Sequence, residues 1–226
     1  MDKYLGVSNE YVSLTPSGYW GNSSDNIQTR ENFMTPEELD FLYTAACNLT
    51  IWDVTERIWD VTESTYNENG TTTYDADLWK DRVCTMANLN RNNKKISPAI
   101  ATLQNRLKKE VDSFFNVEAT ATPPAIVRWK PGHIQLPHAD KELHEGADAG
   151  TPNAFPHFDI AGLFYLNDDY KGGELYFPNQ GIQFKPKAGA AYFFPGDKEY
   201  IHGVTQVTSG FRYTIPFFWT IWAHKG

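Results

Sequence analysis

The sequence of 226 residues contains little cysteine, no long apolar run and no excess of positive charge. Its two cysteines, Cys47 and Cys84, are too few for a disulfide framework and favour free thiols in a reducing compartment. No stretch approaches the roughly 20 apolar residues that a membrane-spanning helix needs. Residues 1–6 lack the apolar segment of a signal peptide. We therefore expect a cytoplasmic protein without a membrane partner.

The charge balance is acidic, with 28 Asp and Glu against 20 Lys and Arg and a formal net charge of -8. A general nucleic-acid-binding protein shows the opposite balance, because it must neutralise phosphates. We therefore expect no nucleic-acid partner, although a local basic groove stays open as an alternative.

Aromatic residues are abundant, at 15% of the chain, with 7 Trp, 12 Tyr and 14 Phe. Such residues favour pleated, half-buried surfaces over helical bundles. The length suits one domain with a substantial core. We expect a mainly β (α+β) single domain over 1–226. Residues 1–120 would form an N-terminal arm, helices and an insertion at 51–88, and residues 121–226 would form the core.

The first half of the chain carries two predicted helices. Residues 1–30 are polar and aromatic and indicate an arm or irregular strand packed on the core. One helix is predicted from Thr35, which can cap it, with Pro36 in the first turn and Glu38 completing a capping box. A second helix is predicted from Ser97 to near Asn116, as a brace outside the sheets. Apolar residues recur at helical spacing on both inner faces: Leu39, Leu42, Ala45 and Ala46 in the first helix, and Ile100, Leu103, Leu107, Val111 and Phe114 in the second.

Between these helices lies a local repeat, IWDVTE at 51–56 and again at 58–63. The repeat occurs only twice, so it does not indicate a solenoid. We interpret it as a strand pair or an extended flap, followed by turn residues at 67–70. A structural insertion is favoured over a functional flap.

From Ala125 onward, short apolar runs alternate with turn residues. Strands are predicted at 125–130, 133–140, 160–167, 173–178, 182–186, 190–194, 201–207 and 211–221. This succession of short strands is typical of a sandwich or jelly roll. The connection 141–156 is long, and long loops in compact domains are often lids.

One predicted strand carries a candidate metal site, His138 and Asp140. Alternate residues of a strand face the same side, so one imidazole and one carboxylate can reach a single point. Two His and one carboxylate with open positions are typical of a non-haem Fe(II) oxygenase, and His202 is the candidate for the missing His. A second HxD pair, His157 and Asp159, could supply the same imidazole and carboxylate ligands. The spacing of the two residues does not exclude this alternative.

The last predicted hairpin places a basic residue near His202. Residues 207–211 are typical of a three-residue turn with glycine at the left-handed position. If the residues that flank the turn pair, His202 lies opposite Pro216, and Arg212 falls on its face about 13 Å away at roughly 3.3 Å per residue. A metal-bound diacid and a long Arg side chain can span that gap, because the guanidinium fork suits a carboxylate. Thr214 shares this face and could add a hydroxyl.

Four sequence blocks between Trp129 and Trp219 resemble the prolyl 4-hydroxylase branch of the Fe(II)/2-oxoglutarate-dependent dioxygenases. They are WKPG at 129–132 leading to PHAD at 137–140, GLFYLN at 162–167 followed by GGELYFP at 172–178, KPKAGAAYFFP at 185–195, and HGV at 202–204 followed by VTSGFRY at 207–213. Their common order and spacing are more specific than any one block. The resemblance implies a double-stranded β-helix, or jelly-roll, core with bracing N-terminal helices.

The resemblance implies roles for individual residues. His138, Asp140 and His202 would bind Fe(II) and form the catalytic centre. The resemblance also places Asp159 at the start of the following strand rather than on the metal strand, which favours His138 and Asp140 over the rival pair. His133 and His144 are expected to be exposed.

A second group of residues would bind the cosubstrate. The resemblance implies that Arg212 and Tyr165 bind the distal carboxylate of 2-oxoglutarate, and Thr214 could assist them. Relatives usually carry Tyr where this chain has Trp129, whose indole nitrogen can only donate, so its role is an open question.

The implied activity is hydroxylation of prolyl residues in a peptide or protein substrate, with release of succinate and CO2. It would use Fe(II), 2-oxoglutarate and O2, with ascorbate as a candidate reductant. A hydroxylase of another residue or of a free amino acid is the nearest alternative. A nucleic-acid demethylase is disfavoured because no Arg follows Arg212. A metal-free jelly-roll binding module is disfavoured because the three metal-ligand candidates occur together with Arg212.

Overall fold

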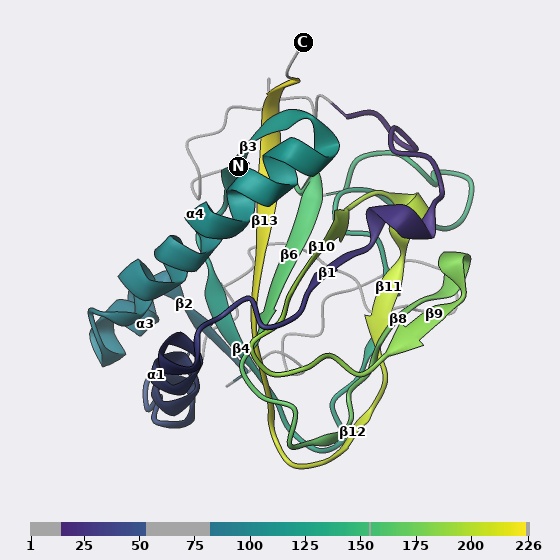
Figure 1. Cartoon of the computed structure of the whole chain (residues 1–226). Helices are drawn as coiled ribbons and strands as arrows, with labels where there is room; N and C mark the ends of the chain where they lie inside the picture. The colour runs from purple at the N-terminus through teal and green to yellow at the C-terminus, as the bar shows by residue number, and fades with distance from the viewer. Residues whose placement is uncertain (1–14, 53–81, 154, 225–226) are drawn as a thin grey trace.

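Two antiparallel β-sheets face each other, and helices α1, α3 and α4 cover the outer side of the larger sheet (Figure 1). The computed structural model describes residues 15–52, 82–153 and 155–224. The sandwich confirms the mainly β jelly roll that the sequence predicts. None of the helices in the described ranges has both the length and the hydrophobicity of a membrane span.

The larger sheet follows the order β1-β10-β6-β13-β4-β2, and β3 also pairs with β13. Its strands are β1 Gln28–Arg30, β2 Val83–Thr85, β3 Val117–Ala121, β4 Ala125–Trp129, β6 Ile160–Tyr165, β10 Ala191–Pro195 and β13 Arg212–His224. The long strand β13 pairs with β6 from Thr214 to Trp219 and with β4 from Arg212 to Thr214. It therefore forms the centre of the sheet.

The smaller sheet follows the order β5-β11-β8-β9. Its strands are β5 Gln135–His138, β8 Leu175–Phe177, β9 Ile182–Phe184 and β11 His202–Val204. A separate pair joins β7 Lys171–Gly172 to β12 Val207–Ser209. Among the described strands, β5 pairs only with β11, so it lies at an edge of the smaller sheet.

The helices are α1 Pro36–Cys47, α3 Met86–Asn92 and α4 Ile96–Phe115. The predicted capping box of α1 is confirmed: Thr35 Oγ1 accepts from Glu38 N at 3.2 Å, and Glu38 accepts from Thr35 N at 2.9 Å. Helix α4 ends where predicted, at Asn116 in the left-handed conformation. The prediction that Phe114 faces the core was wrong, because it is 41% exposed and the neighbouring Phe115 is buried instead.

Two layers of apolar side chains hold these elements together. The first lies between the helices and the larger sheet, where Leu103 and Leu107 of α4 belong to one buried cluster with Phe217 and Trp219 of β13. The second contains Phe177 of β8 from the smaller sheet together with residues of the larger sheet. Burial of apolar side chains from both faces of the larger sheet stabilises the sandwich.

The predicted hairpin of 201–207 with 211–221 was wrong. Strand β11 pairs with β5 and β8, whereas β13 pairs with β4 and β6, so the two belong to different sheets. Gly210 does adopt the left-handed conformation, with φ 78°. The turn there joins β12, which pairs with β7 rather than with β13, to the start of β13 in the larger sheet.

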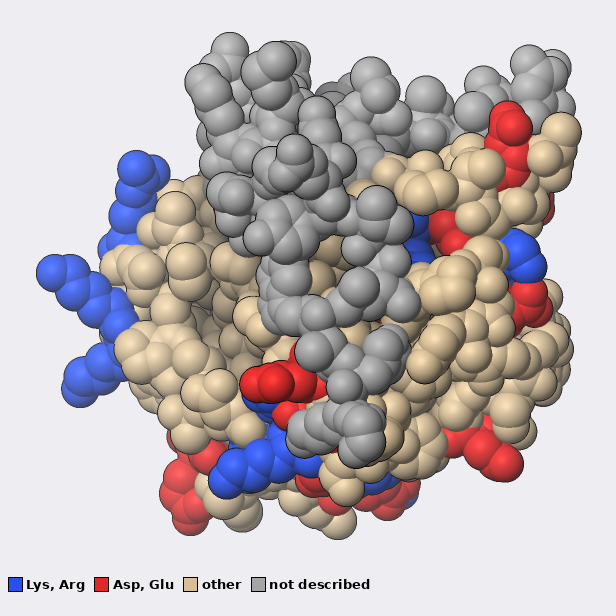
Figure 2. Space-filling model, turned by 90° about the horizontal axis from the view of Figure 1, so that it is seen from above, with Lys and Arg blue, Asp and Glu red and all other residues tan. Residues whose placement is uncertain are grey.

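The described part of the N-terminal arm packs on the core, as predicted. Strand β1 pairs with β10 at the edge of the larger sheet, and Thr15 is buried. Strands β2 and β3 and helix α3 were not predicted from the sequence. The repeat at 51–63 lies almost entirely outside the described residues, which end at Trp52 on that side. Figure 2 shows acidic as well as basic side chains on the described part of one face.

Candidate metal centre and anion chamber

The structure brings His138, Asp140 and His202 together. Residues His138 and His202 face each other in the register of β5 and β11, and Asp140 follows β5. Asp140 Oδ1 lies 3.7 Å from His138 Nε2, and Asp140 Oδ2 lies 3.9 Å from His202 Nε2. One donor atom from each residue lies within 4.8 Å of the others. No other group of three His, Cys, Asp or Glu residues in the described chain meets this condition.

Hydrogen bonds to backbone carbonyls orient both imidazoles. His138 Nδ1 lies 3.0 Å from the Leu136 carbonyl oxygen, and His202 Nδ1 lies 3.1 Å from the Tyr200 carbonyl oxygen. A carbonyl can only accept, so each Nδ1 carries the proton and each Nε2 presents a lone pair toward Asp140. Such contacts fix the tautomer that a metal ligand requires.

The electrostatics of this cluster suit a cation. Burial lowers the pKa of His138, and burial together with the neighbouring His138 lowers the pKa of His202 well below its ordinary value. Burial raises the pKa of Asp140 well above its ordinary value, and its Oδ2 makes no hydrogen bond to any described residue. A buried carboxyl with an unsatisfied oxygen between two neutral imidazoles is costly without a ligand. This donor set fits a divalent transition metal with open positions, such as Fe(II).

Sequence reasoning missed Gln135, which also reaches this cluster. Its side-chain nitrogen lies 3.1 Å from His138 Nε2. Because His138 Nδ1 carries the proton, Gln135 donates to the lone pair that a metal would use. Metal binding at His138 therefore has to displace this amide. Strand alternation did not indicate Gln135, because residues three apart on a regular strand face opposite sides. The pairing of β5 with β11 shifts register between His138 and Gln135.

A second cluster surrounds Arg212, which is 1% exposed. Arg212 Nη2 donates to the Tyr165 hydroxyl at 2.8 Å, while Nε and Nη1 have no hydrogen-bond partner in the described chain. The guanidinium carbon lies 4.6 Å from the centre of the Trp129 ring and 4.9 Å from that of Tyr165. Within the described ranges, no carboxylate forms an ion pair with Arg212. A buried guanidinium without a counter-charge fits an anionic ligand.

The remaining groups of this cluster are also hydrogen-bond donors. Trp129 Nε1 donates to Thr214 Oγ1 at 3.2 Å, so the Thr214 hydroxyl hydrogen is left for another acceptor. The Tyr165 oxygen accepts from Arg212 and likewise keeps its own hydrogen for donation. We call the site formed by Arg212, Tyr165, Thr214 and Trp129 the anion chamber. Its donors complement the lone pairs of a carboxylate. Trp129 contacts both Thr214 and Arg212 within it.

Trp129 also connects the chamber to the metal candidates. It belongs to one buried cluster with Val204, which lies two residues after His202 on β11. Arg212 lies on β13 of the larger sheet and His202 on β11 of the smaller sheet, so the hairpin register that the sequence predicted does not relate the two residues.

Arg82 is a further residue that the sequence did not single out. It is fully buried, and its guanidinium carbon lies 3.9 Å from the centre of the Trp129 ring. A second arginine therefore lies beside the chamber even though none follows Arg212 in the sequence. The absence of a later Arg is consequently no argument against a nucleic-acid demethylase.

The rival HxD pair lies elsewhere. Asp159 accepts hydrogen bonds from Thr15 Oγ1 at 2.6 Å and from Ile221 N at 2.9 Å, and it pairs with Lys141 Nζ at 3.2 Å. We call Thr15, Lys141 and Asp159 the buried clasp. It joins the N-terminal arm to the residue that follows Asp140, so Asp159 is a structural carboxylate here.

The other histidines differ from expectation. His133 is half-buried, and its Nδ1 accepts from Lys130 N at 3.1 Å. The His144 side chain is only 6% exposed, and its charge contributes to lowering the pKa of His202. The prediction that both are exposed was wrong, because the turns that carry them fold back onto the core.

The long connection 141–156 has its own hydrogen bonds. Leu143 N donates to the Thr151 carbonyl at 2.9 Å, and Gly150 N donates to the Leu143 carbonyl at 2.7 Å. Asn153 Nδ2 donates to the Asp140 carbonyl at 3.0 Å. The described part of the loop is therefore a compact hairpin tied to the backbone of a metal-ligand candidate.

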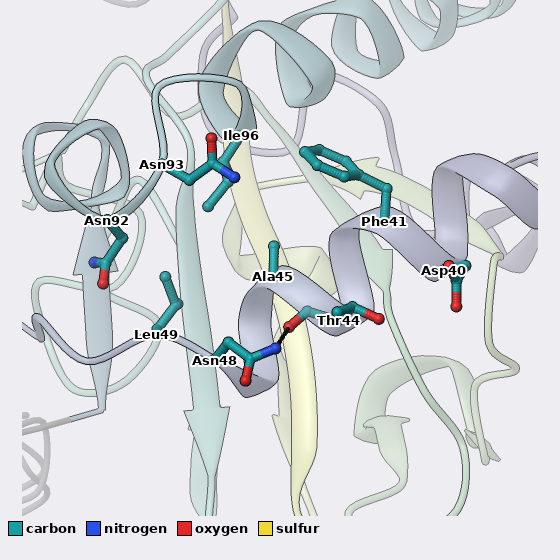
Figure 3. A pocket seen from close by; sticks show the side chains of 9 residues that line it. All are labelled: Asp40, Phe41, Thr44, Ala45, Asn48, Leu49, Asn92, Asn93 and Ile96. Carbon is teal, nitrogen blue, oxygen red and sulfur yellow. Dashed lines mark hydrogen bonds between the residues drawn. The ribbon is translucent and has the colours of Figure 1, made fainter.

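A cavity of about 380 Å³ lies away from both clusters, on the helical side of the larger sheet (Figure 3). It is lined by Asp40, Phe41, Thr44, Ala45, Asn48, Leu49, Asn92, Asn93 and Ile96. Asn48 donates to the Thr44 carbonyl across one side of it. The cavity shares no residue with the metal candidates or the anion chamber.

Comparisons with known proteins agree with this geometry. Residues 125–222 match the sequence model of the 2OG-Fe(II) oxygenase superfamily. Prolyl 3-hydroxylase 3 of Mus musculus is 42% identical over 77 residues, which are 32% of this chain and 10% of the relative. The human prolyl 3-hydroxylase 3 is 39% identical over 77 residues, with the same coverage. The chain thus aligns with about a tenth of the length of these curated relatives.

Solved structures share the fold. The viral collagen prolyl hydroxylase vCPH from Paramecium Bursaria Chlorella virus-1, in its 2OG complex, has a TM-score of 0.57 at 18% identity and covers 88% of this chain and 98% of its own. A prolyl hydroxylase from Trichoplax adhaerens, in complex with a hypoxia inducible factor peptide fragment, has a TM-score of 0.56 at 16% identity and covers 87% and 84%. The stretch that matches the 2OG-Fe(II) oxygenase superfamily, residues 125–222, contains both the metal candidates and the anion chamber.

Proposed function

We propose that this chain is an Fe(II)- and 2-oxoglutarate-dependent dioxygenase that hydroxylates prolyl residues in a peptide or protein. One observation carries the proposal. A cluster of two neutral imidazoles and one carboxylate lies in the same sandwich as a chamber of hydrogen-bond donors, whose guanidinium forms no ion pair with any carboxylate of the described residues.

In this proposal His138, Asp140 and His202 hold the metal through Nε2, a carboxylate oxygen and Nε2. Three protein ligands leave further positions for the cosubstrate and O2. When bound, Fe(II) and 2-oxoglutarate supply oxidative chemistry that converts the cosubstrate to succinate and CO2 and inserts one oxygen atom into a substrate C–H bond. Ascorbate remains a candidate reductant.

The chain's own residues would bind and orient the cosubstrate and shield it from water. Arg212, Tyr165 and Thr214 would hold the distal carboxylate of 2-oxoglutarate, and Trp129 would keep Arg212 and Thr214 in place. All four side chains are at most 4% exposed, so water is excluded from these charged contacts. Contacts between charged groups are stronger in such a water-poor site.

The substrate assignment is supported by the names of the relatives and by the surface beside His138. The relatives are named as prolyl hydroxylases, and one related structure holds a peptide fragment. Ile134, just before the edge strand β5, and Leu136, on that strand, are 40% and 47% exposed. Apolar side chains next to the metal candidates suit the ring of a prolyl residue, and the net charge of -8 favours a basic or proline-rich partner.

Succinate release with Fe(II), 2-oxoglutarate and a panel of proline-containing peptides tests the proposal. We expect succinate together with a peptide that gains the mass of one oxygen atom on proline. Chromatography of the hydrolysed product would separate 3- from 4-hydroxyproline. The sequence blocks resemble prolyl 4-hydroxylases, whereas the curated relatives are named prolyl 3-hydroxylases. Succinate release without peptide oxidation would support the oxygenase activity but contradict the assignment of the tested prolyl peptides as substrates.

Two matched variants identify the metal site in the same experiment. Asp140→Ala should lose both bound iron and succinate release. His157→Ala should keep both, because His157 belongs to the rival HxD pair. Loss of iron from His157→Ala would assign the metal site to the rival HxD pair instead.

A further inference from the structure

Tyr170 lies beside the anion chamber, in the connection between β6 and β7. It is 2% exposed, and its hydroxyl has no hydrogen-bond partner among the described residues. Buried hydroxyl groups nearly always have a partner, and leaving one unsatisfied is destabilising. No sequence pattern singled out this tyrosine.

Two glycines place Tyr170 next to Arg212. A Cβ atom built on Gly173 would lie 3.1 Å from both Arg212 Cδ and Tyr170 Cε2, so the two side chains converge on the same backbone position. Gly173 also has φ 64°, a conformation that favours glycine. On the other side, a Cβ on Gly210 would lie 3.1 Å from Tyr170 Cα. The Tyr170 ring and the aliphatic part of the Arg212 side chain therefore pack against the same glycine.

The Tyr170 hydroxyl is available as a donor. Burial raises its pKa, and nearby Arg212 only partly opposes this effect, so the phenol keeps its proton. The ring is held in place, because the Lys185 ammonium lies 4.8 Å from its centre and donates to the Tyr170 carbonyl at 2.6 Å. The Tyr170 phenol is thus held in place and protonated, and beside it Arg212 Nε and Nη1 also have no acceptor among the described residues.

We propose that Tyr170 is a further binding residue of the anion chamber and donates its hydroxyl to the distal carboxylate of 2-oxoglutarate. The inference rests on the proposed function. A carboxylate offers about four lone-pair sites. One contact from Arg212 and one each from Tyr165, Thr214 and Tyr170 would occupy them. Tyr170 would therefore favour a dicarboxylate over a cosubstrate that lacks the distal carboxylate.

The test measures ligand binding to the Mn(II)-loaded full chain without O2, so that no turnover is needed. Tyr170→Phe keeps the ring and removes the hydroxyl. We expect it to weaken 2-oxoglutarate binding about tenfold, the usual effect of losing one hydrogen bond to a charged group. Binding of 2-oxopentanoate, which has the same carbon chain without the distal carboxylate, should not change. Tyr43→Phe, which removes a hydroxyl from a tyrosine of α1, should leave both affinities unchanged.

A variant at position 170 with fluorinated tyrosine gives a second test that does not depend on the Phe variant folding. The fluorinated phenol keeps the side chain's shape and is a stronger donor, so 2-oxoglutarate should bind more tightly.

Three results would overturn the inference. The first is an unchanged 2-oxoglutarate affinity in Tyr170→Phe, which leaves the proposed function standing. The second is equal weakening of both ligands, which indicates packing alone. The third is failure of the unsubstituted chain to bind 2-oxoglutarate, which removes the proposed function as well.

Discussion

At the scale of single residues, the anion chamber depends on one uncompensated charge. Arg212→Ala removes the guanidinium that donates to Tyr165. Truncating one partner of a buried charge pair costs about 2–5 kcal/mol, so 2-oxoglutarate should bind at least about thirtyfold more weakly while the metal stays bound. Calorimetric titration of the metal-loaded chain with 2-oxoglutarate measures this effect. The matched control is Arg91→Ala on α3, and an unchanged affinity in Arg212→Ala would remove this residue from the chamber.

Substitution of Gln135 should strengthen ligand binding rather than weaken it. Its amide donates to His138 Nε2 and competes with a metal for that lone pair. A typical hydrogen bond contributes about 0.5–1.5 kcal/mol, so Gln135→Ala should bind Mn(II) roughly two- to tenfold more tightly. Competition against a metal-sensitive dye measures the dissociation constant. Gln206→Ala, which alters an exposed glutamine outside the site, is the control. Weaker metal binding in Gln135→Ala would mean that the amide supports the metal rather than competing with it.

At the scale of structural elements, the buried clasp links the arm, the loop after Asp140 and the end of β13. Lys141 and Asp159 are at most 5% exposed in their side chains. Breaking a buried pair by removing one partner costs about 3–5 kcal/mol, because the other charge is left without compensation. Lys141→Met should therefore lower the free energy of unfolding by about that amount, as measured by urea denaturation.

The surface pair of Lys187 and Glu31 is the control for the clasp. Its side chains are 64% and 55% exposed. Exposed pairs contribute about 0–1 kcal/mol, so Lys187→Met should change stability little. Equal effects of Lys187→Met and Lys141→Met would show that burial of the clasp does not matter.

Local elements were predictable where the signal lies within a few residues. The capping box of α1 and the apolar spacing of α4 depend on neighbours three or four positions away, so the sequence alone defined both helices. The placement of β11 and β13 was not predictable in this way. A turn at Gly210 is compatible with a hairpin and with a crossover, and the choice depends on which distant strands, β5, β8, β4 and β6, are free to pair.

At the scale of the whole molecule, stability should depend on pH through Asp197. Burial, with the negative charge of Glu142, raises the pKa of Asp197 to about 7, and the residue is 1% exposed. In the unfolded chain the pKa of Asp is about 3.9, so the folded state holds this proton more tightly. The resulting stabilisation is fully present below about pH 4 and is lost as the pH rises toward 7.

Asp197→Asn isolates this effect. The variant keeps a side-chain oxygen that can accept from Glu199 N, as Asp197 does at 3.1 Å. Relative to the original chain, it should gain stability between pH 5 and pH 8, by up to about 4 kcal/mol. Thermal unfolding of both chains at these two pH values measures the difference. A difference that does not vary with pH would show that Asp197 is ionised throughout.

The sequence by itself determined what depends on short-range geometry. It brought His138 and Asp140 together as close neighbours at one strand, singled out His202 and Arg212 from their blocks, and predicted helices α1 and α4. Only the tertiary structure decided how these residues meet. It brought Arg212 across the sandwich, placed Arg82 against Trp129, enclosed Tyr170 beside Arg212 and joined Lys141 to Asp159. The reason is physical: alternation along a strand is a property of the local backbone, whereas the partners of a buried charge or hydroxyl come from strand pairings between distant parts of the chain.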